Sequence, residues 1–247
     1  MIGILTSNFS IYHDLINSLR KRNIPFVSLT FNDEIPQNVN VIITTDEEKN
    51  KIKFDKIVIC NQNCNIENVI DKAIILSSNK EINLIFGIDP GNNIGIAVYG
   101  NDKLIRRFVA NSPEKAVEYI KTFIRDIGVY NAIVRIGNGA RLVRNRIINL
   151  LHDMSLRIEI VDESTIPCID DDAVAASSIA LTAGKEIKGK FSLEPSEGEI
   201  KEMQRISRIK SKNITISKEL AKKVLIGEME LEEAIKIQKN KNGKMEK

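Results

Sequence analysis

A strand-turn-strand pattern between residues 83 and 99 constrains this 247-residue chain more than any other feature. The apolar run Leu84–Ile88 ends in Asp89, a Pro90-Gly91 turn follows, and a second apolar run covers Ile94–Tyr99. Asp is depleted from strand interiors, and a neighbouring glycine lets a ligand approach the backbone closely. We therefore expect a hairpin whose Asp89 is a candidate ligand for a metal ion or a metal-bound phosphate. The simpler alternative is an Asp that caps the turn after a buried strand.

Downstream of the hairpin, helix and strand patterns alternate. Residues 114–127 place apolar side chains at helix spacing, and Ser112-Pro113 precede them in the order that begins helices. The segments predicted after this helix are a strand at 132–136, a helix at 140–154, a strand at 157–161 and a small-residue helix at 173–181. This alternation predicts an α/β domain over residues 83–188.

Acidic residues gather at three points of this domain. Besides Asp89, Asp162-Glu163 follow the last strand, and Asp170-Asp171-Asp172 precede the small-residue helix. Carboxylates that converge on one spot are suitable ligands for Mg²⁺, which prefers oxygen. Two structural alternatives stay open. Asp162 and Glu163 can be a solvated strand end, and one of the three aspartates can supply negative charge at a helix N-terminus.

Four motifs resemble the RuvC and YqgF branch of the resolvase-like nucleases, within the ribonuclease H-like superfold. They are Gly87-Ile88-Asp89-Pro90-Gly91, Ile136-Gly137-Asn138-Gly139, Val161-Asp162-Glu163-Ser164, and Asp172 with its Ala-rich helix. The second motif is similar to the fourth-strand end in the YqgF-like domain of the Tex transcription-accessory proteins. The resemblance implies a mixed sheet over residues 83–188, with its first strand central and Asp89 facing Glu163 and Asp172.

The same resemblance implies a metal-dependent nuclease that acts on branched DNA or structured RNA. Two Mg²⁺ or Mn²⁺ ions, about 3.5–4 Å apart in sites of this kind, supply a nucleophilic water and stabilise the leaving oxygen. Asp89 would bridge the two ions, Glu163 and Asp172 would each complete one of them, and Asp171 is a further candidate metal ligand. The catalytic candidates are thus Asp89, Glu163 and Asp172.

The chain departs from the family pattern at two places. Ala175 stands where the last RuvC helix typically carries a second acidic residue, so one ligand is missing unless Asp170 or Asp171 replaces it. RuvC also carries a Glu after its fourth strand, where this chain has Gly137-Asn138-Gly139. A catalytically inactive nucleic-acid-binding or scaffold protein with the same fold is therefore the alternative. A kinase- or actin-like ATPase, which shares the Asp-x-Gly loop, would need a second copy of the fold.

Residues 1–80 carry a separate α/β pattern. Short apolar runs between turn residues predict strands, and two longer segments have helix periodicity. The expected strands are Ile2–Thr6, Phe26–Thr30, Val39–Thr45 and Lys56–Cys60, and the expected helices are Ile11–Arg22 and Ile66–Leu76. This order predicts a small parallel sheet of Rossmann-like or flavodoxin-like kind. Since the segment has neither a Gly-x-Gly-x-x-Gly nor a Walker motif, we expect an accessory or protein-contact domain.

The C-terminal region, residues 199–247, is predicted to be helical and basic. Its expected helices lie at 199–212, 218–226 and 230–238, after a linker at 191–198. Its size suits either a helix-turn-helix unit or a small helical appendage on the core. The Lys- and Asn-rich tail from Lys239 onward is expected to be frayed.

The distribution of charge favours a nucleic-acid partner. The net charge of +3 is mild, but three arginines fall in the first turns of the 140–154 helix, where the helix macrodipole disfavours cations. Two more lie on the 199–212 helix. We expect these side chains to contact phosphates. The candidates are Arg141, Arg144, Arg146, Arg205 and Arg208.

Composition is typical of a globular protein, with 43% hydrophobic and 28% charged residues. Because no apolar run reaches eighteen residues and the N-terminus has no basic signal-peptide region, we expect a cytoplasmic protein without membrane contact. Cys60, Cys64 and Cys168 predict no disulfide framework. Abundant Ile, Lys and Glu without Trp are typical of an A+T-rich archaeal source. A homodimer is left open.

Overall fold

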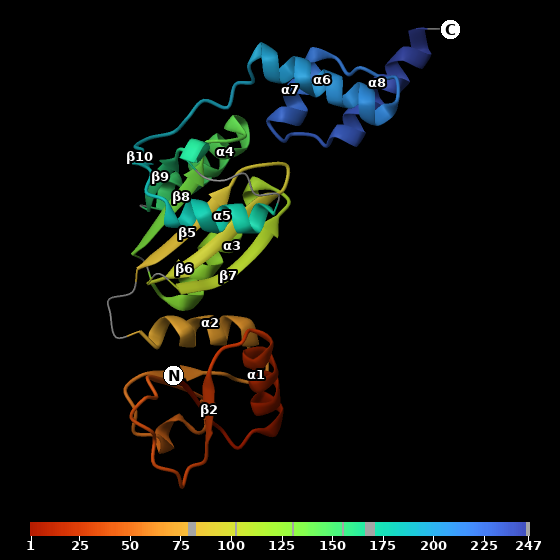
Figure 1. The fold of residues 1–247 in the computed structure, drawn as a ribbon. Coiled ribbons are helices and arrows are strands. Elements are labelled where there is room, and N and C mark those ends of the chain that lie inside the picture. The colour runs from red at the N-terminus through yellow and green to blue at the C-terminus, as the bar shows by residue number, and fades with distance from the viewer. Residues whose placement is uncertain (79–82, 102, 130, 155, 166–170, 246–247) are drawn as a thin grey trace.

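The fold is known from a computed structural model, in which three units follow one another along the chain (Figure 1). The described residues are 1–78, 83–101, 103–129, 131–154, 156–165 and 171–245. A parallel sheet lies at one end, a mixed sheet in the middle, and a group of helices at the other end. The predicted α/β class is therefore confirmed. None of the described helices is long and apolar enough to cross a membrane.

The first unit is a four-stranded parallel sheet in the order β2-β1-β3-β4. Its strands are β1 (Ile2–Leu5), β2 (Phe26–Leu29), β3 (Val41–Thr44) and β4 (Ile57–Ile59). The expected parallel sheet is confirmed, although each strand is shorter than predicted. The 3-10 helix η1 (Lys49–Lys51) follows β3.

Two helices pack on this sheet, α1 (Phe9–Lys21) and α2 (Ile66–Leu76). α1 begins earlier than predicted because the Asn8 side chain caps it, accepting a hydrogen bond from the backbone N–H of Ile11 at 3.2 Å. Asn65 caps α2 in the same way, and the bounds of α2 are those predicted.

The second unit is a six-stranded mixed sheet in the order β10-β9-β8-β5-β6-β7. Strand β6 (Ile94–Gly100) pairs antiparallel with β5 (Leu84–Asp89) on one side and with β7 (Lys103–Ala110) on the other. On the far side of β5, β8 (Ala132–Gly137) and β9 (Arg157–Val161) run parallel to it. The mixed sheet with an interior first strand is as predicted. The sequence pattern missed only the short edge strand β10 (Lys185–Glu186) among the described strands of this unit, because two residues carry no periodicity.

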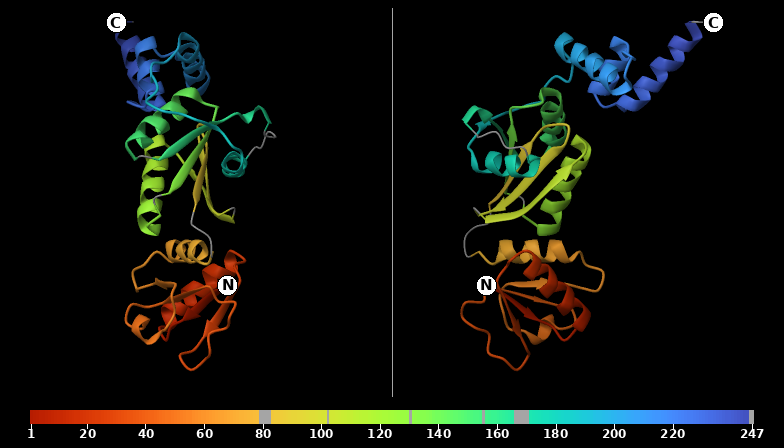
Figure 2. Two further views of the ribbon diagram at one scale, coloured as in Figure 1. Left: turned by 90° about the vertical axis from the view of Figure 1, so that its left-hand side faces the viewer. Right: turned by 45° about the vertical axis from the view of Figure 1, so that its right-hand side comes forward.

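Helices cover both faces of the mixed sheet. α3 (Pro113–Ile127) and α4 (Arg141–Leu151) lie on one face, and α5 (Asp172–Leu181) lies on the other (Figure 2). As predicted, Ser112 caps α3. The predicted 140–154 helix is α4 followed by the 3-10 turn η2 (His152–Met154).

α5 lies directly against the backbone of the hairpin. A Cβ added to Gly87 would come within 2.1 Å of the Ala176 carbonyl oxygen, and one added to Gly95 within 1.9 Å of the Asp172 carbonyl oxygen. Only glycine fits at both positions. The glycines of β5 and β6 therefore set the height of α5 above the sheet and hold its first turn beside the end of β5.

The third unit consists of α6 (Glu197–Ser211), α7 (Lys218–Leu225) and α8 (Leu231–Met245) around a small apolar core. Ser196 and Glu199 form a capping box at the start of α6, so Gly198 belongs to the helix and not to the predicted linker. Gly227, with φ +75°, follows α7. α8 continues to Met245, beyond the helix end predicted at residue 238.

α2 joins the first two units, between which it lies in Figure 1. Ile70 belongs to the core under the parallel sheet, while Ile75 belongs to the core of the mixed sheet. Between them, the fully buried Asp71 forms ion pairs with Arg22 of the first unit at 2.8 Å and with Arg106 of β7 at 2.7 Å. Burial raises the pKa of Asp71, and the two guanidinium groups oppose that rise.

Candidate functional site

The acidic candidates of the mixed sheet lie near one another at one end of it. Asp89 is the last residue of β5, Glu163 begins the 3-10 turn η3 (Glu163–Thr165) after β9, and Asp172 begins α5. Because β5, β8 and β9 are parallel, their carboxyl ends meet at the same edge. Asp89 pairs in register with Gly95, on which the backbone of Asp172 rests. Each of the three acidic residues is half-buried.

Two glycines after β8 provide the space for Glu163. The backbone N–H of Gly139 donates a hydrogen bond to Oε1 of Glu163 at 2.9 Å. A Cβ on Gly137 would lie 2.3 Å from the same oxygen, so a larger residue there would displace the carboxylate. The Gly137-Asn138-Gly139 motif thus holds Glu163 near the end of β5. Glu163 is consequently more than a solvated strand end.

The electrostatics of the cluster centre on Asp89. Burial, followed by the negative charges of Glu163 and Asp172, raises the pKa of Asp89 from an ordinary 3.8 to about 6. A carboxylate in this state has lost water and gained like-charged neighbours without a compensating cation. A pKa displaced by burial and by specific charged neighbours is characteristic of functional sites.

The described acidic side chains supply suitable oxygen donors for a divalent metal ion but do not surround one position. Across the described ranges, no three His, Cys, Asp or Glu side chains are close enough to hold one ion together. Asp170, one of the proposed replacements for the missing ligand, lies outside the described residues. The donor chemistry therefore suits Mg²⁺ or Mn²⁺, while the side-chain positions fall short of a closed coordination shell.

Asp171 takes the structural role that was the alternative for the aspartate triplet. Its Oδ1 accepts hydrogen bonds from the backbone N–H groups of Ala173 at 2.9 Å and Val174 at 3.0 Å, which makes it the N-cap of α5. One carboxylate oxygen of Asp171 is thus committed to the helix. Asp172, and not Asp171, is the member of the pair that acts electrostatically on Asp89.

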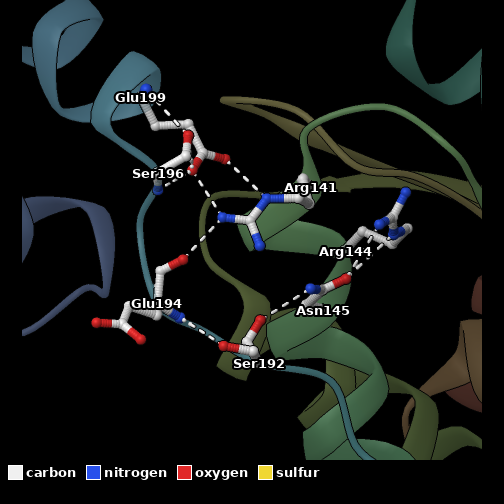
Figure 3. Close-up of polar contacts among 7 residues, drawn as sticks. All are labelled: Arg141, Arg144, Asn145, Ser192, Glu194, Ser196 and Glu199. Atoms are coloured by element: carbon white, nitrogen blue, oxygen red, sulfur yellow. Dashed lines mark hydrogen bonds and ion pairs between the residues drawn. The ribbon is translucent and has the colours of Figure 1, made fainter.

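Arg141 lies at the start of α4 and binds the C-terminal unit (Figure 3). Its guanidinium donates to both carboxylate oxygens of Glu199, with the shorter distance 2.7 Å, and to the carbonyl oxygen of Glu194 at 2.9 Å. Hydrogen bonding to Arg141 is the main cause that lowers the pKa of Glu199 to about 2. The Ser196-x-x-Glu199 capping box marks the start of α6 in the sequence, but it does not indicate the pairing with Arg141.

Arg144 is directed back toward the loop after β8. It donates to the carbonyl oxygen of Asn138 at 2.9 Å. It also donates to the side chain of Asn145 (Figure 3). Burial is the main cause that lowers the pKa of Arg144, with Arg141 adding to the effect and Glu163 opposing it. Of the three arginines of α4, Arg144 is therefore the one whose charge interacts with the acidic cluster.

Arg146 connects α4 to α3 and to the end of α7. Its Nε lies 2.6 Å from a carboxylate oxygen of Glu114 in α3, and its Nη1 donates to the carbonyl oxygen of Ile226. Arg141, Arg144 and Arg146 thus all have intramolecular partners, so the fold itself gives a reason for cations in this helix. A phosphate contact from any of them would require exchange of such a partner.

The two arginine candidates of α6 are on the surface. Arg205 forms an exposed ion pair with Glu202 at 2.7 Å, one helical turn away. Arg208 is exposed and has no ion-pair partner within the described part of the chain. Arg208 is thus the candidate whose charge is least neutralised by the fold.

The carboxyl edge of the parallel sheet forms a second polar site. A cavity of about 920 Å³ opens there, lined among others by Ser7, Asp46, Glu48 and Asn61. The buried Glu48 accepts hydrogen bonds from the Thr6 hydroxyl at 2.6 Å and the Thr45 hydroxyl at 2.8 Å. Its other oxygen accepts from the backbone N–H and the hydroxyl of Ser7. This carboxylate is fully engaged inside the protein.

Two segments of the chain match known families. Residues 1–76 are similar to a response regulator receiver-like domain, and residues 196–240 are similar to a three helical bundle domain. Neither match reaches half of the chain. A search of curated proteins found no match. The acidic cluster around Asp89 lies between the two matched segments.

Proposed function

We propose that residues 83–188 form a ribonuclease H-like domain of the RuvC and YqgF kind and act as a metal-dependent nuclease on branched DNA or structured RNA. The order of elements supports this proposal. Three antiparallel strands are followed by α3, β8, α4, β9 and α5, and β5 is in the interior of the sheet. The resemblance implies the same order, in which three strands are followed by a helix, a strand, a helix, a strand and a helix.

The observation that carries the proposal is the placement of three carboxylates at one end of the mixed sheet: Asp172 rests on Gly95 beside Asp89, and Gly139 holds Glu163. Burial and the charges of Glu163 and Asp172 raise the pKa of Asp89, so these carboxylates repel one another. A divalent cation would relieve this repulsion, and it would supply an activated water and neutralise charge on the phosphate. Asp89, Glu163 and Asp172 are the residues that would hold it. Gly139 fixes the orientation of Glu163, and Arg144 adds positive charge beside the cluster.

A cleavage assay with matched variants tests the proposal. The wild-type chain should cut four-way junctions, flaps or structured RNA in Mg²⁺ or Mn²⁺, and Asp89→Asn should abolish the cutting. Glu118→Gln is the control, since Glu118 is an exposed carboxylate on α3 outside the cluster. Nucleic-acid affinity of Asp89→Asn should be unchanged or higher. Equal cleavage by the wild type and Asp89→Asn would place any activity elsewhere.

A second candidate is a catalytically inactive nucleic-acid-binding or scaffold protein with the same fold. Two observations favour it: Ala175 stands at the place of a family ligand, and the described acidic side chains do not form a closed metal site. Metal-independent binding without cleavage would support this alternative. The kinase- or actin-like alternative loses support, because the chain described after Gly189 forms α6, α7 and α8 and no second sheet.

A further inference from the structure

A cavity of about 690 Å³ lies between the parallel sheet and strand β7. Its apolar lining comes from both units and includes Ile24 and Pro25 after α1, Ile74 of α2, and Leu104 of β7. Ligand cavities usually have volumes of roughly 300–1,000 Å³ and occur preferentially between domains. In volume and position, this cavity is suited to a small molecule.

The charged groups of the same cavity are mostly cationic. Arg22, Lys103, Arg106 and Arg107 line it, and Glu67 is the acidic member of the lining. Glu67 is already paired, with Arg22 at 3.1 Å. The carboxylate therefore does not neutralise the other three cations.

The four cations divide into two pairs with different roles. Arg22 and Arg106 are the partners of the buried Asp71 and thus belong to the joint between the units. Lys103 and Arg107 are exposed on β7, and neither has an ion-pair or hydrogen-bond partner within the described ranges. Arg22 and Arg106 thus stabilise the fold, whereas the side chains of Lys103 and Arg107 are available to a ligand.

The cavity is separate from the acidic cluster. Lys103 pairs in register with Gly100, which in turn pairs with Leu84 at the start of β5. Asp89 is at the opposite end of the same strand. The cationic cavity and the candidate nuclease site therefore occupy opposite ends of the hairpin and differ in the sign of their charge.

We propose that this cavity binds a small organic anion, in which a phosphate or carboxylate group is attached to an apolar body. Lys103 and Arg107 both line the cavity and would supply the positive charge that attracts the anionic group, while Ile24, Pro25 and Leu104 would contact the apolar body. An inorganic anion would leave the apolar walls uncovered, and a neutral apolar molecule would leave two cations without a partner. A nucleoside phosphate and an alkyl phosphate both have the required chemistry.

Isothermal titration of the full chain tests this proposal with four probes. Adenosine monophosphate and octyl phosphate represent the two kinds of apolar body, while inorganic phosphate and adenosine each lack one half of the chemistry. At least one amphipathic anion should bind with one-to-one stoichiometry, and at least tenfold more tightly than phosphate or adenosine. Which of the two binds more tightly identifies the apolar body. If neither binds, or if phosphate alone binds equally well, the proposal is wrong.

Charge-matched variants locate the binding. Lys103→Ala combined with Arg107→Ala should weaken the amphipathic anion at least tenfold. Lys115→Ala combined with Lys121→Ala removes the same charge from exposed positions on α3 outside the cavity and should change affinity less than twofold. Arg22 and Arg106 are left intact because they pair with Asp71. Equal weakening in both double variants would show a general charge effect and overturn the assignment to this cavity.

Discussion

Glu48 and Asp89 both lie near the carboxyl ends of strands, yet the pKa of Glu48 is lowered and the pKa of Asp89 is raised. Burial raises the pKa of Glu48, but hydrogen bonds from Ser7, Thr6 and Thr45 outweigh it and bring the value to about 2. At Asp89, burial acts together with two neighbouring negative charges and brings the pKa to about 6. The number of donors around a carboxylate, and not its burial, decides the direction.

This difference separates a structural carboxylate from a candidate functional one. Glu48 connects the loops after β1 and β3, so its charge stabilises the first unit. Asp89 is held beside Glu163 and Asp172 at a cost in stability. Functional sites often keep a destabilising arrangement of charges that a bound ligand removes. The electrostatic argument for function therefore applies to Asp89 in the mixed sheet and not to Glu48.

The largest effect on stability is expected from Glu48→Gln. The amide replaces an acceptor with a donor among four donating groups, so the free energy of unfolding at pH 7 should fall by roughly 2 to 4 kcal/mol. Since the folded pKa lies below the ordinary 4.5, the contribution of Glu48 is present above about pH 4.5 and is lost as the pH falls toward about 2. Denaturant titrations at pH 7 and pH 3 measure this.

The control for this change is Glu47→Gln, an exposed neighbour whose substitution should alter the unfolding free energy by less than about 0.5 kcal/mol. If Glu48→Gln is as stable as the control at pH 7, the hydrogen bonds around Glu48 contribute little, and the contrast with Asp89 disappears.

Asp89→Asn should change stability in the opposite direction. Removing the repelled charge should raise the unfolding free energy at pH 7 by roughly 1 to 3 kcal/mol. The folded pKa lies above the ordinary 3.8, so the cost is absent below about pH 4 and develops as the pH rises toward about 6. The gain of the variant over the wild type should follow this curve in denaturant titrations. A variant less stable than the wild type at pH 7 would contradict the assigned repulsion.

Divalent metal provides the next comparison. Saturating Mg²⁺ should raise the melting temperature of the wild type by a few degrees, because a ligand that binds only the folded state stabilises it. The Asp89→Asn variant should respond less, while Glu48→Gln should respond as the wild type does. Differential scanning fluorimetry at constant ionic strength measures all three. Identical shifts in all of them would indicate binding away from the cluster.

The smallest stability effect is expected from the arginines of α4. Arg141→Ala with Arg144→Ala should lower affinity for duplex DNA and flatten the plot of log affinity against log salt by roughly one to two units. Its cost to stability should be near 1 kcal/mol, since the pair between Arg141 and Glu199 is partly exposed. Filter binding across a salt series measures the slope. If the wild type shows no salt-dependent affinity for DNA or RNA, both proposed functions fall.

Local sequence patterns predicted many of the helices and strands correctly. The bounds of α2 and β9 were predicted residue for residue, because each is a strongly periodic segment between clear turn signals. The same reasoning placed Ser112 at the start of α3. It failed where no local signal exists, as for β10, and it ended α8 too early.

Pairings between distant side chains could not be predicted from one sequence. Arg141 and Glu199 are 58 residues apart, and nothing local to either indicates the other. The Gly137-Asn138-Gly139 motif was noticed as a family likeness, but its contact with Glu163 required the fold. The acidic candidates could be named in advance, whereas the electrostatic state of Asp89 depends on how α5 rests on Gly95.

The position of α2 has a consequence for the nascent chain. When residues 1–76 have left the ribosome, the parallel sheet and both of its helices are complete. The side of α2 that carries Ile75, however, packs against the mixed sheet, which is synthesised later. Until β5, β6 and β7 arrive, that side presents apolar surface, and Asp71 has Arg22 but lacks Arg106. A first unit that folds at this stage would expose the apolar side of α2 until the mixed sheet is made, and exposed apolar surface of this kind favours aggregation.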